Sequence, residues 1–269
     1  MIGRRKLLPE YLDWNRTWGA PEGYPEIRTI PMGTRLKSAD RRMGPFAFQR
    51  QSRTRVFEYP WAYFTARPER GTRVLDVGGG LAGFQFVLDL EGCQVTNADP
   101  LALDDDNQWT LEASTYLSLL MTEANHELIN STFGTNVTLV TKKLQDCDFA
   151  DGSFDRIFCL SVLEHLHATE ARTVAEHMAR LLAPGGTLLL TVDLFFDVQP
   201  LGRLTRNAWG GNLDIAALTD GLGLEMVVGE PRELLGFDEF DLDHVVEQFP
   251  ELLSGQYPVV SQALALRKS

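Results

Sequence analysis

The sequence predicts an α/β protein whose core is a doubly wound, mostly parallel sheet of seven strands, preceded by an N-terminal extension. Three observations predict this class. The chain has 269 residues, of which 44% are hydrophobic and 23% charged, and this is enough to bury a sizeable core. From Thr72 onward, short apolar runs alternate with helical patterns, as parallel strands require because their connections cross over the sheet. Three consecutive glycines, Gly78 to Gly80, directly follow the first of these runs.

Residues 1–70 form an extension that is rich in aromatic and basic residues and has no long periodicity. A disordered tail would not carry so many large rings, because a chain buries such rings to offset the entropy of ordering. Residues 1–73 hold 15 basic and 7 acidic side chains, about +8, whereas the rest of the chain is at about −20. We therefore expect the extension to fold onto its own acidic domain, residues 71–269, as a lid and a wall of the substrate site.

The basic extension leaves two further interpretations open. Some of its arginines could meet an anionic small-molecule substrate. A nucleic-acid-binding arm is the least favoured interpretation, because the acidic body would repel a phosphate backbone. We expect a small-molecule partner and no nucleic acid, and the sequence does not fix the oligomeric state.

The predicted secondary structure follows the hydrophobic pattern along the chain. Strands are expected where short apolar runs are bounded by turn residues, at 73–77, 93–98, 137–141, 154–161, 187–192, 224–228 and 259–266. Helices are expected where apolar residues recur at helical spacing, at 81–90, 110–132, 169–182 and 213–221. The helix at 169–182 ends before Pro184-Gly185-Gly186, a segment that cannot continue it. The last strand is expected to return like a hairpin and so to run antiparallel.

The ends and the cysteines exclude several classes of protein. The basic N-terminus has no apolar stretch behind it, and no run of 18 apolar residues exists, so we expect no signal peptide, no membrane span and a cytoplasmic location. The three cysteines, Cys93, Cys147 and Cys159, are odd in number and lack C-x-x-C spacing. We expect packing thiols, with neither a disulfide framework nor a zinc site.

The glycine turn carries the first chemical signal. Gly78, Gly80 and Gly83 match G-x-G-x-x-G, in which glycines let the backbone approach a ligand at a helix N-terminus. Asp99, about 20 positions on at the end of the next strand, is placed to accept hydrogen bonds from both ribose hydroxyls. This pair suits a nicotinamide dinucleotide and S-adenosylmethionine equally. Asp76, just before the glycines, would face a diphosphate unfavourably but could help to hold a cationic amino-acid tail.

Two more segments follow in order, 151–166 with Ser153-Phe154-Asp155 and Leu163-Glu164-His165, and 180–190 with Pro184-Gly185-Gly186. Together with Val74-Leu75-Asp76-Val77-Gly78 they resemble the class I S-adenosylmethionine-dependent methyltransferases, in their small-molecule, type 11-like branch. The resemblance covers about residues 72–193. It implies a Rossmann-like fold, S-adenosylmethionine as cofactor with S-adenosylhomocysteine as product, and a small-molecule acceptor, with oxygen favoured over nitrogen or carbon.

The resemblance also implies a set of cofactor-binding residues: Asp76, Gly78, Gly79, Gly80, Asp99, Leu144, Asp146 and Leu160. Within it, Leu160 would back the methionine portion and the Leu144 N–H would meet adenine. The chain departs from the family at Lys143, where an Asp usually contacts the adenine amine. Asp146 is the candidate to take that contact if it is shifted into place.

Two residues are catalytic candidates: Asp193, which ends the fifth strand at the carboxyl rim where such sheets bind ligands, and His165, at the start of a helix. Some relatives carry E-x-x-E-H here and bind magnesium, but this chain has Ser161 at the first Glu position, so we expect no metal. A structural role for Glu164 and His165 is the alternative to a base. A base would raise the rate about 10²–10⁴-fold for a hydroxyl acceptor, but would bring nothing for a carboxylate acceptor.

The substrate site is expected where the extension meets the sheet. Tyr59 and Trp61 would wall the acceptor pocket, with Arg53 or Arg55 near an anionic group. The alternative is an extension that packs on the sheet for stability alone. For the whole protein, two other functions stay open: an NAD-dependent oxidoreductase, and a catalytically idle cofactor-binding scaffold.

Overall fold

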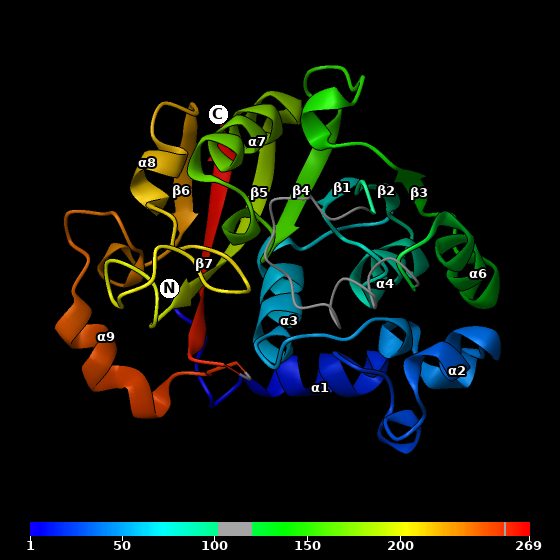
Figure 1. Ribbon diagram of the computed structural model, residues 1–269. Coiled ribbons are helices and arrows are strands. Elements are labelled where there is room, and N and C mark those ends of the chain that lie inside the picture. The colour runs from blue at the N-terminus through cyan, green and yellow to red at the C-terminus, as the bar shows by residue number, and fades with distance from the viewer. Residues whose placement is uncertain (102–119, 256) are drawn as a thin grey trace.

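The computed structural model describes residues 1–101, 120–255 and 257–269 and contains a seven-stranded sheet in the order β3-β2-β1-β4-β5-β7-β6 (Figure 1). The strands are β1 Arg73–Val77, β2 Gln94–Ala98, β3 Thr138–Val140, β4 Phe154–Leu160, β5 Leu182–Phe195, β6 Leu224–Val228 and β7 Val259–Lys268. Neighbours from β3 to β5 are parallel, and β7 is antiparallel to both β5 and β6. The predicted fold class, including its one antiparallel strand, is confirmed.

Helices cover both faces of the sheet (Figure 1). They are α1 Pro9–Trp18, α2 Met32–Lys37, α3 Arg55–Ala66, α4 Gly83–Leu90, α6 Glu123–Phe133, α7 Ala168–Leu181, α8 Ile215–Thr219 and α9 Leu242–Gln248. Successive strand residues point to opposite faces. Phe158 therefore packs in the core with α3 and α4, while Ile157 and Cys159 pack in the core with α7 and α8. Because both faces are buried, the central strands read as nearly continuous apolar runs.

The N-terminal extension is part of the core rather than a separate lobe. Helix α3 lies along β4: Arg156 Nε donates to the Ala66 carbonyl at 2.8 Å, and at the other end Arg55 Nη1 donates to Ser161 Oγ at 2.5 Å. The aromatic side chains of the extension share one buried cluster with α4, in which the Tyr59 ring stacks on Phe84 with centroids 5.4 Å apart. The N-terminal end of α3 thus reaches the carboxyl rim of the sheet.

Most predicted elements lie within a few residues of their expected bounds, with two differences. The described part of the predicted helix 110–132 is not continuous, and residues 110–119 lie outside the described residues. Helix α6 begins only at Glu123, because Thr122 has an extended backbone (φ −133°) and its side chain caps the helix by accepting from the Asn125 N–H at 3.2 Å. Strand β5 is longer than predicted and includes the Pro184-Gly185-Gly186 segment.

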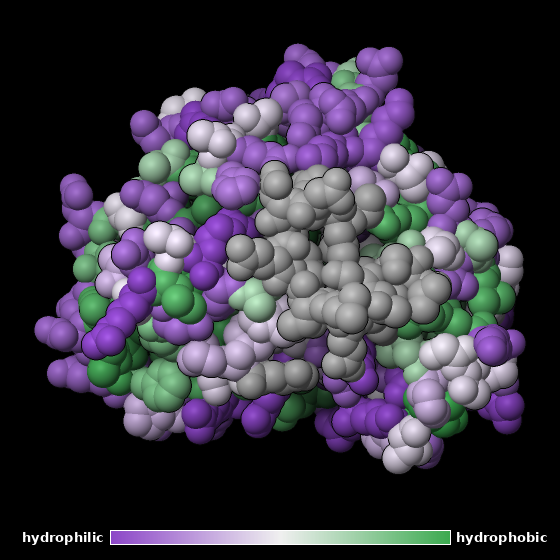
Figure 2. Space-filling model, in the orientation of Figure 1, coloured by the Kyte–Doolittle hydropathy of each residue, from purple (hydrophilic) through white to green (hydrophobic). Residues whose placement is uncertain are grey.

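All three cysteines are buried and free. Several large hydrophobic side chains are exposed on and beside α9, namely Leu242, Val246 and Phe249. Figure 2 shows apolar surface at the lower left of the view, where α9 lies in Figure 1, and these three residues do not line the cavity described below. Among the described residues, no helix is both long and apolar enough to cross a membrane.

Candidate active site

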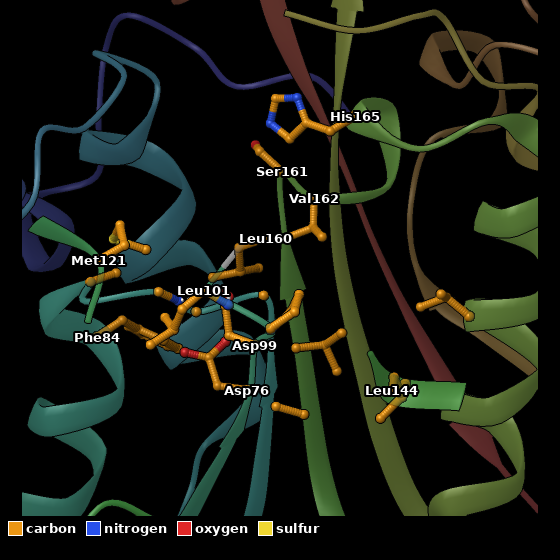
Figure 3. A pocket seen from close by; sticks show the side chains of 18 of the residues that line it. Asp76, Phe84, Asp99, Leu101, Met121, Leu144, Leu160, Ser161, Val162 and His165 are labelled. Atoms are coloured by element: carbon orange, nitrogen blue, oxygen red, sulfur yellow. Dashed lines mark hydrogen bonds between the residues drawn. The ribbon is translucent and has the colours of Figure 1, made fainter. Parts of the chain in front are cut away.

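A cavity of about 330 Å³ lies at the carboxyl ends of the central parallel strands (Figure 3). Its walls come from the segments after β1, β2, β3 and β4, from α7 and from the N-terminal extension. The chain order reverses between β1 and β4, and ligands of open α/β sheets bind at such a switch point. The cavity is therefore the candidate active site.

The loop after β1 has all four of its amides engaged within the protein. The backbone is left-handed at Gly78 (φ +70°) and at Gly80 (φ +54°), a conformation that glycine adopts without steric cost. The Gly78 amide donates to the Ala98 carbonyl at 2.9 Å, and the Gly79 amide donates to Asn97 Oδ1 at 3.2 Å. The Gly80 amide donates to Asp99 Oδ2 at 2.7 Å, and the Leu81 amide donates to Gln49 Oε1 at 2.6 Å. The loop is held in place by side chains from β2 and from the extension.

Two carboxyl groups stand next to this loop, the buried Asp76 on β1 and the half-buried Asp99 after β2 (Figure 3). Asp99 accepts from the Gly80 and Leu101 amides, each at 2.7 Å, and burial raises its pKa. Asp76 is 4% exposed, and its burial, together with the charge of Asp99, raises its pKa to about 7 against the opposing effect of Arg55. A cation would relieve the crowding of negative charge here, and an anion would increase it.

The predicted adenine end contains one residue that the sequence analysis missed. Leu144 is buried and lines the cavity, whereas Asp146 is exposed and is not among the lining residues. Glu170, at the start of α7, does line the cavity and accepts from Lys143 Nζ at 3.0 Å and from Gln145 Nε2 at 3.4 Å. A carboxylate is thus present near the place where the family carries an Asp, but it comes from a different element.

Residues of the N-terminal extension form one wall of the cavity, and they differ in part from those expected to contact the acceptor. Tyr59 lines it and donates from its hydroxyl to Gln51 Oε1 at 2.9 Å. Arg55 also lines it, with its guanidinium 5.7 Å from the centre of the Tyr59 ring. Two of the expected residues do not line the cavity. Trp61 is buried in the core, where its ring stacks on Phe57, and Arg53 is exposed to solvent. On α3, the side chains that face the cavity are therefore Arg55 and Tyr59, which are four residues apart and share one face of the helix.

Behind Arg55 lies a buried polar network centred on Glu58, which the sequence analysis did not single out. Glu58 is fully buried, and its Oε2 accepts from Arg55 Nη1, from Ser161 Oγ at 2.9 Å and from Thr191 Oγ1 at 3.0 Å. Ser161 has φ +50°, an uncommon value for a residue that is not glycine. The i,i+3 spacing of Arg55 and Glu58 was the one available signal, because it places both on the same face of a helix.

The two catalytic candidates differ in their access to the cavity. His165 lines it, and burial lowers its pKa to about 4, so the ring is neutral. Its Nδ1 is hydrogen bonded to the Trp209 carbonyl, which can only accept, so Nδ1 carries the hydrogen and Nε2 the lone pair. Asp193 is 3% exposed and is not among the lining residues. Burial, and then the charge of Glu58, raises its pKa to about 7.

We expect methyl transfer to survive treatment with EDTA. Ser161 provides no carboxylate, and among the described residues no group of three metal-ligating side chains is placed to hold an ion. The measurement is turnover before and after chelation. Loss of activity that added magnesium restores would show that Glu164 and His165 recruit a third ligand.

Comparisons with known proteins agree with this geometry. The family model described as "Methyltransferase domain" matches residues 48–214. A comparison with curated protein sequences gave no match.

Solved structures with a similar fold are only distantly related in sequence. The 1,6-didemethyltoxoflavin-N1-methyltransferase of Burkholderia thailandensis, with its substrate and S-adenosylhomocysteine bound, is 14% identical over 100% of this chain and 95% of its own, with a TM-score of 0.52. The PH0226 protein of Pyrococcus horikoshii OT3 is 14% identical over 96% of this chain and 99% of its own, with a TM-score of 0.52. The [4+2]-cyclase SpnF is 14% identical over 78% of this chain and 79% of its own, also with a TM-score of 0.52. At 14% identity these structures show a shared fold and no more. The family model matches more than half of the chain and establishes membership. The chain therefore belongs to the methyltransferase domain family and has the fold of class I S-adenosylmethionine-dependent methyltransferases.

Proposed function

We propose that this protein transfers a methyl group from S-adenosylmethionine to a small molecule, with an oxygen atom as the favoured acceptor. The observation that carries this proposal is the state of the loop after β1. Its four amides are all engaged, one of them by the Asp99 carboxylate, and the carboxylate of Asp76 stands beside them.

This arrangement favours a cationic ligand over a dinucleotide. A dinucleotide-binding loop offers unengaged N–H groups to a diphosphate at the start of a helix. Here a diphosphate would have to displace protein acceptors and approach Asp76 and Asp99. The methionine end of S-adenosylmethionine instead carries an ammonium and a sulfonium, which the same carboxylates would attract.

The remaining cofactor contacts follow from the walls of the cavity. Asp99 would accept hydrogen bonds from the ribose hydroxyls with the lone pairs that its two amide contacts leave unused. Leu160, at the end of β4, would pack against the methionine portion. Leu144 would meet adenine, and Glu170 would accept from the adenine amine in place of the missing Asp.

The acceptor chemistry depends on the other end of the cavity. When bound, S-adenosylmethionine supplies an electrophilic methyl group, so the protein has to align the acceptor and hold its proton. His165 lines the cavity, and its Nδ1 is bonded to the Trp209 carbonyl, which leaves the lone pair on Nε2, so it is the residue we assign to take a hydroxyl proton. Its pKa of about 4 makes it a weak base, so its contribution to the rate should be small. An anionic acceptor has less support, since Arg53 lies outside the lining and Arg55 is ion-paired with Glu58.

Calorimetry on the full chain tests the cofactor assignment. We expect S-adenosylhomocysteine to bind and NAD⁺ not to bind. The reverse result would support the oxidoreductase alternative. Since a [4+2]-cyclase has a similar fold, turnover needs its own test, and transfer of an isotopically labelled methyl group into a metabolite mixture, detected by mass spectrometry, separates an enzyme from an idle scaffold.

Cofactor affinity is expected to rise with pH near neutrality. The pKa of Asp76 in the free protein is about 7, so the carboxyl group is protonated below this pH and ionised above it. The cationic tail binds the ionised form, and its own amino group stays protonated throughout this range. Affinity for S-adenosylhomocysteine, measured by calorimetry between about pH 6 and 8, should therefore increase in the parent. In Asp76→Asn this dependence should disappear, and a parent profile that is flat or falls with pH would contradict the role of Asp76.

Cofactor binding is also expected to protect the part of the extension that walls the cavity. Gln49, Gln51, Arg55 and Tyr59 line the site, so S-adenosylhomocysteine should slow amide hydrogen exchange over residues 49–59. Helix α9 lies outside the lining and serves as the internal control. Equal exchange with and without the ligand over residues 49–59 would show that the extension only stabilises the fold.

A further inference from the structure

Three buried carboxyl groups lie just beyond the cavity, and we call them the acidic cluster: Glu58 on α3, Glu164 after β4 and Asp193 on β5. Glu58 and Glu164 are 0% exposed, and Asp193 is 3% exposed. The cluster adjoins the cavity through Ser161, which lines it and donates from Oγ to Glu58 Oε2 at 2.9 Å. Glu164 does not line the cavity and has no role in the proposed methyl transfer.

The acidic cluster has more acceptor atoms than the protein satisfies. Glu58 Oε1, both carboxyl oxygens of Glu164 and Asp193 Oδ1 are buried and have no hydrogen-bond partner among the described residues. A buried polar atom without a partner is costly, and four such atoms in one cluster are unusual in a folded protein. These four acceptor atoms could be satisfied by a bound group that donates several hydrogen bonds.

The charge of the acidic cluster points to the same kind of group. Arg55 is the cation whose charge acts on both Glu164 and Asp193, and its Nη1 is already shared between Glu58 and Ser161. The pKa of Glu164 is raised by burial first and then by the charge of Asp193, so these two carboxyl groups repel each other. Burial and mutual repulsion raise the pKa values of Glu164 and Asp193, so one guanidinium does not keep all three carboxyl groups ionised, and a second cation would favour their ionised forms.

An aromatic stack borders Asp193. The Tyr257 hydroxyl donates to Asp193 Oδ2 at 3.5 Å, and its ring lies parallel to that of Trp209, with centroids 4.9 Å apart and an interplanar angle of 5°. Tyr257 also stacks with Phe195, with ring centroids 6.0 Å apart. Carboxylates next to aromatic faces form a common protein environment for ammonium groups.

We propose that the acidic cluster is a subsite of the acceptor pocket and that it selects a small molecule bearing a protonated amine. This inference rests on the proposed function and names its substrate class. The acceptor's ammonium would donate to Glu164 and Asp193, while its hydroxyl lies toward His165, which lines the cavity. The acidic cluster binds acceptors that carry a positive charge more tightly than neutral or anionic ones, and it takes no part in cofactor binding.

The test compares matched compounds that differ only in charge. The full chain is saturated with S-adenosylhomocysteine, and binding is measured by ligand-observed NMR titration for tyramine, tyrosol and hydroxyphenylpropionate, and for aminobutanol, butanediol and hydroxybutyrate. On at least one scaffold we expect the amine to bind about tenfold more tightly than the alcohol, with the carboxylate weakest. Asp193→Asn and Glu164→Gln, each nearly isosteric, should reduce that preference to about threefold or less. Glu225→Gln, an exposed position on β6, is the matched control and should keep it.

Several results would overturn the inference. These are a preference for the carboxylate, equal binding of amine and alcohol on both scaffolds, no binding of either amine, or an amine preference that persists in both cluster variants. Each of these is read with S-adenosylhomocysteine bound. Failure of S-adenosylhomocysteine itself to bind would instead contradict the proposed function, so the two failures are distinguishable.

Discussion

Replacing Asp99 by alanine is expected to weaken binding of S-adenosylhomocysteine by about 1.5–3 kcal/mol, or roughly 10- to 150-fold. The substitution removes the carboxylate that would hold the ribose hydroxyls. It also removes the acceptor for the Gly80 and Leu101 amides, so the loop loses part of its support. Calorimetry measures the affinity, and the melting temperature, recorded in parallel, shows whether the fold is retained.

Asp146→Ala is the matched control for this variant. Asp146 is a nearby acidic residue that is exposed and outside the cavity lining, so its loss should leave affinity unchanged. If Asp99→Ala binds the ligand as tightly as the parent does, the ribose assignment is wrong. If Asp146→Ala alone weakens binding, the shifted adenine contact considered from the sequence is the correct one.

Replacing Phe84 by alanine is expected to lower the free energy of unfolding by about 3–5 kcal/mol. Phe84 is 1% exposed and joins three parts of the molecule. Its ring stacks on Tyr59 of the extension at 5.4 Å, meets Phe158 of the sheet edge-on at 5.0 Å and lies 6.2 Å from Trp14 of α1. Truncation removes apolar contacts on all three sides and leaves a cavity that this rigid core cannot close.

Denaturant unfolding of Phe84→Ala measures this cost, and Phe249→Ala is its control. Phe249 is 39% exposed and should change stability by less than about 0.5–1 kcal/mol. A single cooperative transition at lower denaturant is expected for Phe84→Ala, because extension and sheet share one core. Two separate transitions would mean that residues 1–70 unfold independently, and the cluster that includes Phe84 would then not couple them.

The parts of the site that could be predicted from the sequence are those formed by neighbouring residues. A strand, a glycine turn and a helix start are encoded within a few positions, so β1 and Asp76 fall where the pattern places them. Asp99 follows because the two parallel strands β1 and β2 end at the same edge of the sheet. Each of these predictions needed only local conformation and the direction of a strand.

In the extension, one helix that was not predicted changes which residues are assigned to the site. Because the helix Arg55–Ala66 was not recognised from the sequence, Tyr59 and Trp61 were expected to form one wall together, with Arg53 or Arg55 near an anionic group. On that helix Arg55 and Tyr59 share the face toward the cavity, whereas Trp61 points into the core and Arg53 precedes the first turn. A periodicity of 3.6 residues separates neighbours in sequence onto different faces.

By itself, the sequence determined the fold class, the order of the seven strands along the chain, the cofactor loop and the family, because each is set by short-range patterns of polarity and glycine. Only the tertiary structure decided which distant side chains meet: Glu58 from the extension contacts Thr191 across 133 positions, and Glu170 from α7 pairs with Lys143, which stands where an Asp was expected. Pairings at such separations depend on how helices pack on a sheet, and that packing follows from the burial of the whole core rather than from any local pattern.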